Sequence, residues 1–262
     1  DFAGNLMAGE TIPRAPGAMD LDDLLDATDL LVDRVCAKAG IERSALAAMG
    51  LGVPGFVDCP AGMVRWSPIL NRRHVPLAAK VAERTGLVTY IDNDANLVTL
   101  AELWFGVGRE LSDFAVVTIE HGVGMGFVIN HRIFRGSLGM GMELGHTKVQ
   151  LDGALCRCGQ RGCLEAYVAD YALVREAQTA LNLTSRDAQS VGALLESLYD
   201  HAKAGNSAAR SIFHRAGRYL SLGLSNIVNL FDPQLIILSG ERLRFDYLYA
   251  KETLAEMKEL CL

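Results

Sequence analysis

The sequence predicts an α/β fold with two lobes around a cleft. Short apolar runs that suit buried strands alternate with longer segments whose apolar residues recur at helical spacing. Hydrophobic residues make up 50% and charged residues 21% of the 262 residues. A chain of this length and composition can bury a sizeable core in one large domain or in two smaller lobes. It contains no internal repeat and no low-complexity tract.

The first half of the chain contains several predicted elements. Residues 1–9 are predicted to hold the end of a strand, a Gly-Asn turn and the start of another strand. Residues 21–39 have apolar residues at helical spacing with acids between them, which predicts an amphipathic helix. Buried strands are predicted over 46–53 and 88–91. The first strand ends at Pro54 and Gly55, and the carboxyl end of a strand is where α/β folds usually place ligands.

The second half is predicted to be mostly helical after a hairpin. Two strands over 114–119 and 125–129 flank Gly122 and Gly124, which favour a tight turn. Helical spacing and a final apolar run then predict four elements: helices over 164–180, 190–204 and 207–230, and a strand over 235–238. A further helix is predicted to start after Asn93 and Asp94 and to run to about residue 105.

The most specific motif of the chain is a cluster of metal-ligand residues. His146, Cys156, Cys158 and Cys163 form an Hx9CxCx4C array, the ligand types of a closed tetrahedral zinc site. Three of the six cysteines fall within eight residues, whereas a disulfide framework would spread them along the chain. The sequence therefore predicts one structural zinc ion; the alternative is three unrelated thiols.

Composition excludes several classes of protein. No run approaches the roughly 18 apolar residues of a membrane span, and no basic segment precedes an apolar core at the start. Cys36, Cys59 and Cys261 stand alone, which suits a reducing compartment, so we expect a cytoplasmic protein. The net charge of −6 argues against DNA binding by this segment itself, because phosphate contacts need clustered Lys and Arg.

The segment GMELGHTKVQLDGALCRCGQRGCLEAY, residues 141–167, resembles the signature of the ROK family of bacterial sugar kinases and sugar-responsive transcriptional repressors. The resemblance implies the actin-like ATPase (ribonuclease H-like) two-lobed fold. We expect an N-terminal lobe over 1–92 and a C-terminal lobe over 93–262, with the zinc loop at 143–165. Members of the family begin with a strand and a DxGGT-type phosphate loop and end with a further strand and helix. We therefore expect this chain to lack its N-terminal strand and its C-terminal end.

The resemblance also implies a sugar site. Asp94 matches the general base of the family's kinases, and Asn93 matches a sugar-binding residue. Taken alone, Asp94 could instead cap the helix that starts there. His146 would bind metal through one ring nitrogen and a sugar hydroxyl through the other, and Glu143 and Glu165 resemble two more sugar contacts. From the residues alone, either glutamate could be a solvated surface acid.

One segment departs from the family's kinases. Residues 120–126 align with a GTGxGGG-like loop that binds the phosphates of ATP. Here His121 replaces the threonine, Met125 replaces a glycine, and Glu120 adds a negative charge, all of which weaken anion binding. The alternative for this segment is a plain β-hairpin with glycines at its tip. A histidine before GVGxG is similar to ROK repressors of the glucose and N-acetylglucosamine type.

A second departure lies in residues 66–77, where many family members have SPNLxxW. Ile69 takes the place of the asparagine that donates to the sugar, and Asn71 follows two residues later. Either Asn71 serves in a shifted loop, or one hydroxyl contact is lost. Arg72 and His74 fill the stretch near the family's usual tryptophan, and solvated charges are the simplest interpretation of Arg72 and Arg73.

These observations favour the effector-binding and oligomerisation domain of a ROK-family transcriptional regulator of carbohydrate metabolism. It would bind a sugar or sugar phosphate between its lobes, form a homodimer or homotetramer, and reach DNA only through a helix-turn-helix domain upstream of residue 1. No membrane partner is expected. The alternative is an ATP-dependent ROK kinase of a hexose or N-acetylhexosamine with Asp94 as base. A third hypothesis is a sugar sensor without DNA binding.

Overall fold

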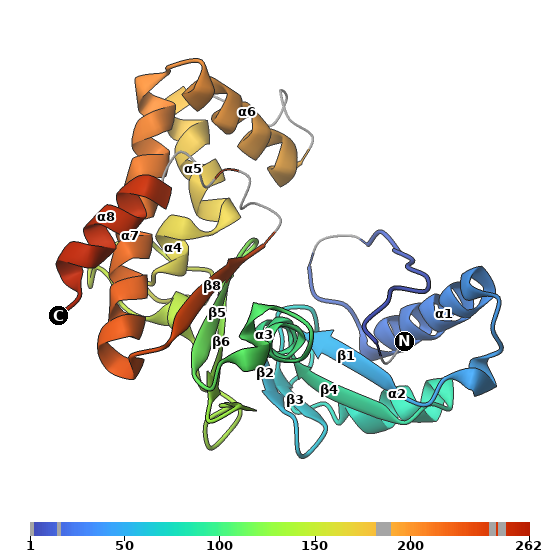
Figure 1. Cartoon of the computed structure of the whole chain (residues 1–262). Coiled ribbons are helices and arrows are strands. Elements are labelled where there is room, and N and C mark those ends of the chain that lie inside the picture. The colour runs from blue at the N-terminus through green and yellow to red at the C-terminus, as the bar shows by residue number, and fades with distance from the viewer. Residues whose placement is uncertain (1–2, 15–16, 182–189, 241–244, 246–249) are drawn as a thin grey trace. The chain divides into compact units, whose positions relative to one another are not determined.

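The computed structural model describes residues 3–14, 17–181, 190–240, 245 and 250–262, and it divides into two compact units (Figure 1). Unit 1 consists of residues 1–110 and 133–141, and unit 2 consists of residues 111–132 and 142–262. The chain therefore passes between the units three times.

The described residues of unit 1 form two small sheets and three α-helices. In chain order its elements are α1 (Leu21–Ala39), β1 (Met49–Val53), β2 (Phe56–Asp58), β3 (Met63–Trp66), α2 (Leu77–Thr85), β4 (Thr89–Asn93) and α3 (Asp94–Trp104), with short 3-10 turns at Arg43–Ala45 and Val107–Glu110. Strands β1 and β4 pair in parallel, and β2 and β3 pair antiparallel. The core of this unit contains Val53, Val64, Leu77, Val81 and Ile91. The parallel pair ends at Val53 and Asn93, which brings the turn after β1 next to the start of α3.

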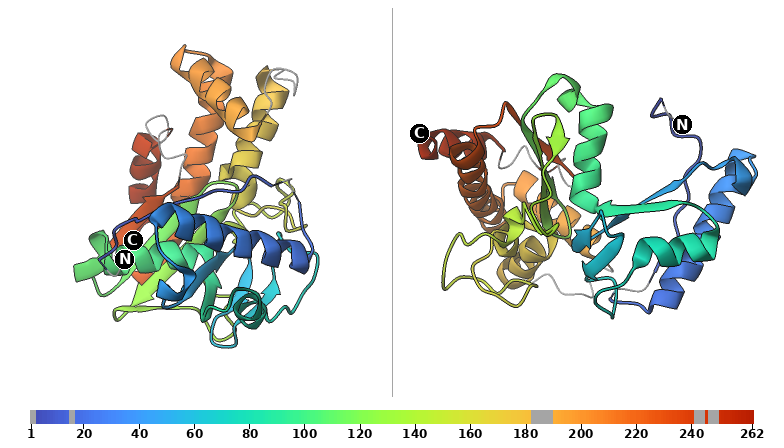
Figure 2. Two further views of the ribbon diagram at one scale, coloured as in Figure 1. Left: turned by 90° about the vertical axis from the view of Figure 1, so that its right-hand side faces the viewer. Right: turned by 90° about the horizontal axis from the view of Figure 1, so that it is seen from below.

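Unit 2 is built on a mixed sheet with the strand order β7-β6-β5-β8. The strands are β5 (Phe114–Ile119), β6 (Val123–Ile129), β7 (Arg132–Ile133) and β8 (Leu235–Ser239). Its helices, which pack against one another (Figure 2), are α4 (Glu165–Val168), α5 (Asp170–Leu181), α6 (Val191–Lys203), α7 (Ser207–Phe231) and α8 (Ala250–Leu260). Side chains such as Val117, Phe127, Leu164, Phe213 and Leu220 are almost fully buried in the core.

Several predicted elements are confirmed. The helix predicted over 21–39 is α1, and Gly40 ends it in the left-handed conformation with φ 67° that glycine adopts at low cost. The hairpin of β5 and β6 is also confirmed, although β6 starts at Val123 rather than at Met125. The long amphipathic helix over 207–230 is α7, capped by the Asn206 side chain, which accepts a hydrogen bond from the Ala209 amide.

Other predictions were wrong. No strand lies in residues 3–9, the described part of the segment 1–9 predicted as a strand–turn–strand. The helix predicted over 164–180 is divided into α4 and α5, because Ala169 is extended and the Asp170 amide donates to the Glu120 carbonyl at 2.9 Å. β2, β3, α2 and α8 were not predicted. Because α3 belongs to unit 1, the boundary differs from the one expected after residue 92.

Among the described residues, no helix is both long and apolar enough to span a bilayer.

Candidate functional site

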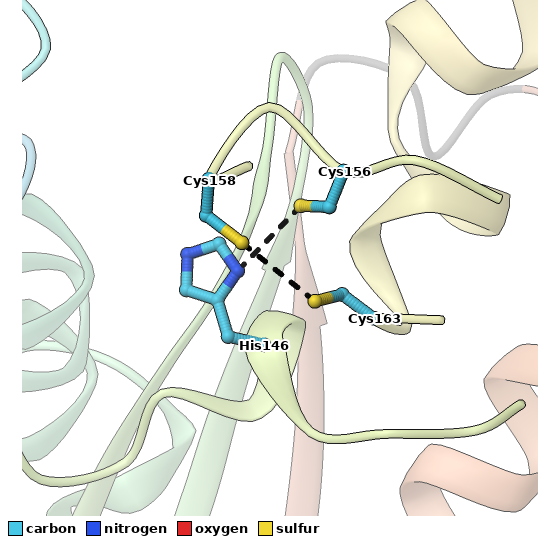
Figure 3. A group of neighbouring side chains, drawn as sticks. All are labelled: His146, Cys156, Cys158 and Cys163. Carbon is cyan, nitrogen blue, oxygen red and sulfur yellow. Dashed lines mark hydrogen bonds between the residues drawn. The ribbon is translucent and has the colours of Figure 1, made fainter. Parts of the chain in front are cut away.

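The four predicted metal ligands converge on one point (Figure 3). One ligand atom from each of His146, Cys156, Cys158 and Cys163 lies within 4.8 Å of all the others. The Cys156 Sγ atom is 3.8 Å from His146 Nδ1, and the Cys158 Sγ atom is 3.7 Å from Cys163 Sγ. A tetrahedron with metal–sulfur bonds of about 2.3 Å has edges of about 3.8 Å. A disulfide needs a sulfur–sulfur distance of about 2.05 Å, so the spacing fits a metal centre and not a disulfide.

Backbone hydrogen bonds shape the loop that carries these ligands. The Cys156 amide donates to the Gln160 carbonyl at 2.8 Å, and the Gly159 amide donates to the Cys156 carbonyl at 3.0 Å. At the other end of the loop, Gly162 has a φ of +75°, and a Cβ atom there would lie 1.6 Å from the Gln150 carbonyl oxygen. Only glycine fits this close approach. The tight turn and the close approach bring the thiols of this short segment together.

Charged and polar neighbours surround the sulfur atoms. The Lys148 Nζ atom donates to Cys163 Sγ at 2.9 Å, and this hydrogen bond raises the pKa of the Lys148 ammonium. Burial raises the pKa of the Cys156 thiol to about 12. A bound divalent cation has the opposite effect, because it stabilises the thiolate. The chain therefore offers a partly buried, nitrogen- and sulfur-lined group that suits a borderline-soft metal ion.

The His146 ring and the Glu165 carboxylate both contact the residues around the cysteine loop. Nδ1 of His146 faces Cys156, and Figure 3 shows its other ring nitrogen pointing away from the three sulfur atoms. Glu165 is only 9% exposed; its Oε2 accepts from the Val123 amide at 3.3 Å, and its Oε1 accepts from the Tyr171 hydroxyl at 3.4 Å. Glu165 is therefore not a solvated surface acid. Glu143 is half-buried and precedes the 3-10 turn Leu144–His146.

The hairpin between β5 and β6 has an acidic tip. Ile119 pairs with Val123, so the turn consists of Glu120, His121 and Gly122 only. Gly122 lies in this turn, whereas Gly124 lies in strand β6. Met125 lies in strand β6 with its side chain in the core of unit 2.

Two buried carboxylates lie against this tip. The Glu165 Oε2 atom would be 2.9 Å from a Cβ atom at Gly122. Asp170 is 2% exposed, and its Oδ2 atom lies 3.8 Å from His121 Nδ1. Together with Glu120, these groups place negative charge around the backbone that would have to receive a phosphate.

In unit 1, Asn93 and not Asp94 caps helix α3. The Asn93 side-chain oxygen accepts from the Ala95 amide at 2.9 Å and from the Asn96 amide at 3.3 Å. Its Nδ2 donates to the Gly55 carbonyl at 3.0 Å. Asp94 is exposed at the first position of the helix, where its carboxylate also accepts from the Ala95 amide at 2.9 Å. The helix dipole stabilises a carboxylate at this position.

In the loop at residues 66–77, the side chain and the backbone amide of Asn71 are both hydrogen-bonded within unit 1. The Asn71 Nδ2 atom donates to Asp20 Oδ1 at 2.6 Å, and the Asn71 amide donates to the Met19 carbonyl at 3.2 Å. Ile69 packs against the core of unit 1. Arg72 and Arg73 are exposed, as expected for solvated charges, and His74 is exposed as well.

Two residues near the candidate site were not predicted from the sequence. Asp92 is 4% exposed and accepts from Arg135 Nε at 2.9 Å and from Arg135 Nη2 at 2.6 Å. A charged residue at the end of a buried strand is a signal that could have identified Asp92. Arg135 lies 43 positions away from Asp92 in a loop without a motif, so the sequence carries no comparable signal for it.

Comparison with known proteins identifies the family. The ROK family model matches residues 17–261, so the chain belongs to the ROK family. It has the α/β actin-like ATPase fold of that family. The chain is 31% identical over 249 residues to a glucokinase of Streptomyces coelicolor, covering 92% of this chain and 76% of the relative. It is 29% identical over 238 residues to the xylose repressor of Caldicellulosiruptor bescii, covering 89% of this chain.

Solved structures show the same two kinds of relative. A ROK glucokinase from Streptomyces griseus in complex with glucose and AMPPNP has a TM-score of 0.81 and 30% identity, covering 99% of this chain and 82% of that one. A ROK transcriptional regulator described as a homologue of the Escherichia coli MLC protein has a TM-score of 0.80 and 25% identity, covering 94% of this chain and 62% of that one. The chain spans 60% of the length of the Caldicellulosiruptor bescii xylose repressor.

Replacing Gly162 with alanine is expected to disrupt the metal loop. The new Cβ atom would overlap the Gln150 carbonyl, so the backbone between Cys158 and Cys163 must move. Metal content and melting temperature should both fall. Gly159→Ala is the matched control, because Gly159 also has a positive φ of 88° but meets no atom within 4 Å. It should lose only about 1 to 2 kcal/mol of conformational energy and retain metal. Equal metal content in the two variants would contradict this account of the loop.

Proposed function

We propose that this chain is the sugar-sensing effector-binding and oligomerisation domain of a ROK-family transcriptional regulator of carbohydrate metabolism. The observation that carries the proposal is the tip of the β5–β6 hairpin, where Glu120 and His121 stand beside the carboxylates of Glu165 and Asp170. Phosphoryl transfer depends on groups that stabilise the negative charge of the nucleotide. Carboxylates at the tip would instead repel the negatively charged phosphates of the nucleotide.

The second candidate is an ATP-dependent ROK kinase of a hexose or N-acetylhexosamine. It is favoured by Asp94, an exposed carboxylate at the first position of a helix, which would be the general base. It is also favoured by the 31% identity to a Streptomyces glucokinase. The acidic hairpin tip leads us to prefer the regulator.

In the proposed function, Asn93, Asp94, Glu143, His146 and Glu165 contact one sugar or sugar phosphate. The proposal is supported by the ROK membership and by the local geometry of each residue within its own unit. Carboxylates accept hydrogen bonds from hydroxyl groups and repel phosphate, so this set favours the neutral hydroxyls of the ligand. Asn93 already donates to Gly55, which leaves one amide hydrogen for a ligand.

We further propose that His146, Cys156, Cys158 and Cys163 hold one zinc ion. Two of the three thiols are buried, and the interatomic distances match a tetrahedron of the size zinc requires. The ion would stabilise the loop and fix the His146 ring, leaving Nε2 for a ligand.

Sugar binding would change operator affinity by shifting the population of two states that bind the sugar unequally. DNA binding is assigned to a helix-turn-helix domain upstream of residue 1. The reason is that this segment is acidic and its sequence shows no cluster of Lys and Arg residues. The active form would be a homodimer or homotetramer in the cytoplasm, where a regulator meets both its sugar and its operator.

Elemental analysis of the metal-replete protein should give one zinc ion per chain. Cys158→Ser removes one ligand, so zinc should be lost and the melting temperature should fall. Cys261→Ser is the matched control, since Cys261 lies outside the cluster, and it should keep its zinc. A normal zinc content in Cys158→Ser would rule out this ligand set.

The protein should show no sugar kinase activity above background. A coupled assay with ATP, magnesium and a panel of hexoses and N-acetylhexosamines measures this directly. The physical reason is the acidic hairpin tip, which disfavours the nucleotide phosphates. Robust turnover that disappears in Asp94→Asn would instead establish the kinase.

Asp94→Ala and Glu165→Ala should each weaken sugar binding measured by calorimetry. The loss should be about 1.5 to 3 kcal/mol for each hydrogen bond to a charged group. Glu110→Ala, which removes another exposed acid of unit 1, should bind like the wild type. Ile69→Asn should tighten or broaden binding if the missing amide contact is restored. Unchanged affinity in both Asp94→Ala and Glu165→Ala would exclude the proposed ligand set.

A further inference from the structure

Residues 133–141, here called the connecting segment, belong to unit 1, although the chain on both sides of them belongs to unit 2. The segment is closed on itself by a hydrogen bond from the Gly141 amide to the Arg135 carbonyl at 3.2 Å. Gly136 and Gly139 have positive φ angles of 72° and 70°, which allow the tight reversal. Glu143, a proposed ligand residue, follows two residues after Gly141.

The Arg135 side chain fixes this segment to strand β4. Its Nε and Nη2 atoms both donate to Oδ2 of Asp92, a carboxylate that is 4% exposed. The other oxygen of Asp92, Oδ1, accepts from the Asn93 amide at 2.8 Å and from Asn96 Nδ2 at 3.0 Å. One buried carboxylate therefore joins the connecting segment to the first residues of α3.

A second contact holds the connecting segment on unit 1. A Cβ atom at Gly139 would lie 2.3 Å from the Val57 carbonyl oxygen of β2, so the two backbones are in direct contact. The segment is thus held at β2 by close packing and at β4 by a charge pair. Of these two contacts, only the charge pair reaches Asn93.

We propose that Arg135 is a positioning residue for the ligand site. Acting through Asp92, it holds the Asn93 amide and the start of α3, and through the Gly141 hydrogen bond it holds the chain that leads into Glu143. This proposal rests on the proposed function, because it takes Asn93, Asp94 and Glu143 as ligand contacts.

The chemistry of the pair explains why an arginine is needed. A buried carboxylate is stable only when its lone pairs are paired, and Asp92 has four donors around it. Two of these donors come from one rigid guanidinium, which fixes a direction as well as a distance. Removing them leaves Asp92 charged and underpaired, so it should turn toward water and release Asn93.

The test compares Arg135→Gln with Arg132→Gln, an exposed arginine three residues earlier. Sugar affinity is measured by calorimetry and amide exchange by hydrogen–deuterium mass spectrometry. Arg135→Gln should weaken affinity roughly tenfold, as expected if the released Asn93 loses one hydrogen bond to the ligand. It should raise amide exchange over residues 93–97 and 136–143. Amide exchange in α1, which lies in the same unit, should stay unchanged. Arg132→Gln should change neither measurement. A purely structural role would raise exchange throughout unit 1, including α1.

Wild-type affinity in Arg135→Gln, or unchanged exchange over 93–97, would overturn the proposal. Raised exchange in α1 as well would also overturn it. If Arg135→Gln does not fold, Asp92→Asn/Arg135→Gln removes both charges and leaves none buried alone, and the same expectations apply to it. If the wild-type protein binds no sugar, the proposed function fails, and the exchange pattern alone then supports or overturns the role of Arg135.

Discussion

The convergence of four ligand side chains in residues 146–163 is the constraint on which the candidate site in unit 2 depends. Most of this segment forms turns and isolated bridges rather than regular elements, and local backbone hydrogen bonds such as that from the Cys156 amide to the Gln160 carbonyl shape it. Its sulfur and nitrogen atoms approach to the distances of a tetrahedral metal centre. Metal binding can supply the folding free energy that a small hydrophobic core would otherwise provide. Glu143 and Glu165 flank this segment, so they depend on the same support.

The sequence identified features that short-range patterns determine. Helix α1 has the predicted bounds because its apolar spacing is regular and Gly40 supplies a left-handed end. The metal ligands were identifiable because ligand type and spacing are themselves the signal. Long-range contacts were not identifiable. The break between α4 and α5 depends on a hydrogen bond from Asp170 to Glu120, 50 positions away in the sequence (170 minus 120). The Arg135–Asp92 pair depends on a chain path that crosses between units, which no local pattern encodes.

Residue roles were predicted less well than residue positions. Asp94 was considered a helix cap, yet Asn93 fills that role, because its side chain reaches the amides of Ala95 and Asn96. Asp and Asn have similar capping preferences, so composition alone could not choose between them. Similarly, Asn71 looked like a substitute for the missing sugar contact at Ile69, but its amide donates to Asp20. In both places, the role of the residue is determined by a hydrogen bond that forms only in the folded chain.

The fold cannot distinguish a regulator from a kinase, since a glucokinase and a transcriptional regulator match it with TM-scores of 0.81 and 0.80. The distinction must come from local charge, and the hairpin tip is tied to the metal loop. Within unit 2, Glu165 accepts from the Val123 amide, and a Cβ atom at Gly145 would lie 2.2 Å from the Val123 carbonyl oxygen. The metal loop thus contacts both polar groups of the residue that follows the tip. The loop that carries His146 and the three cysteines therefore also helps to keep the acidic hairpin tip in place.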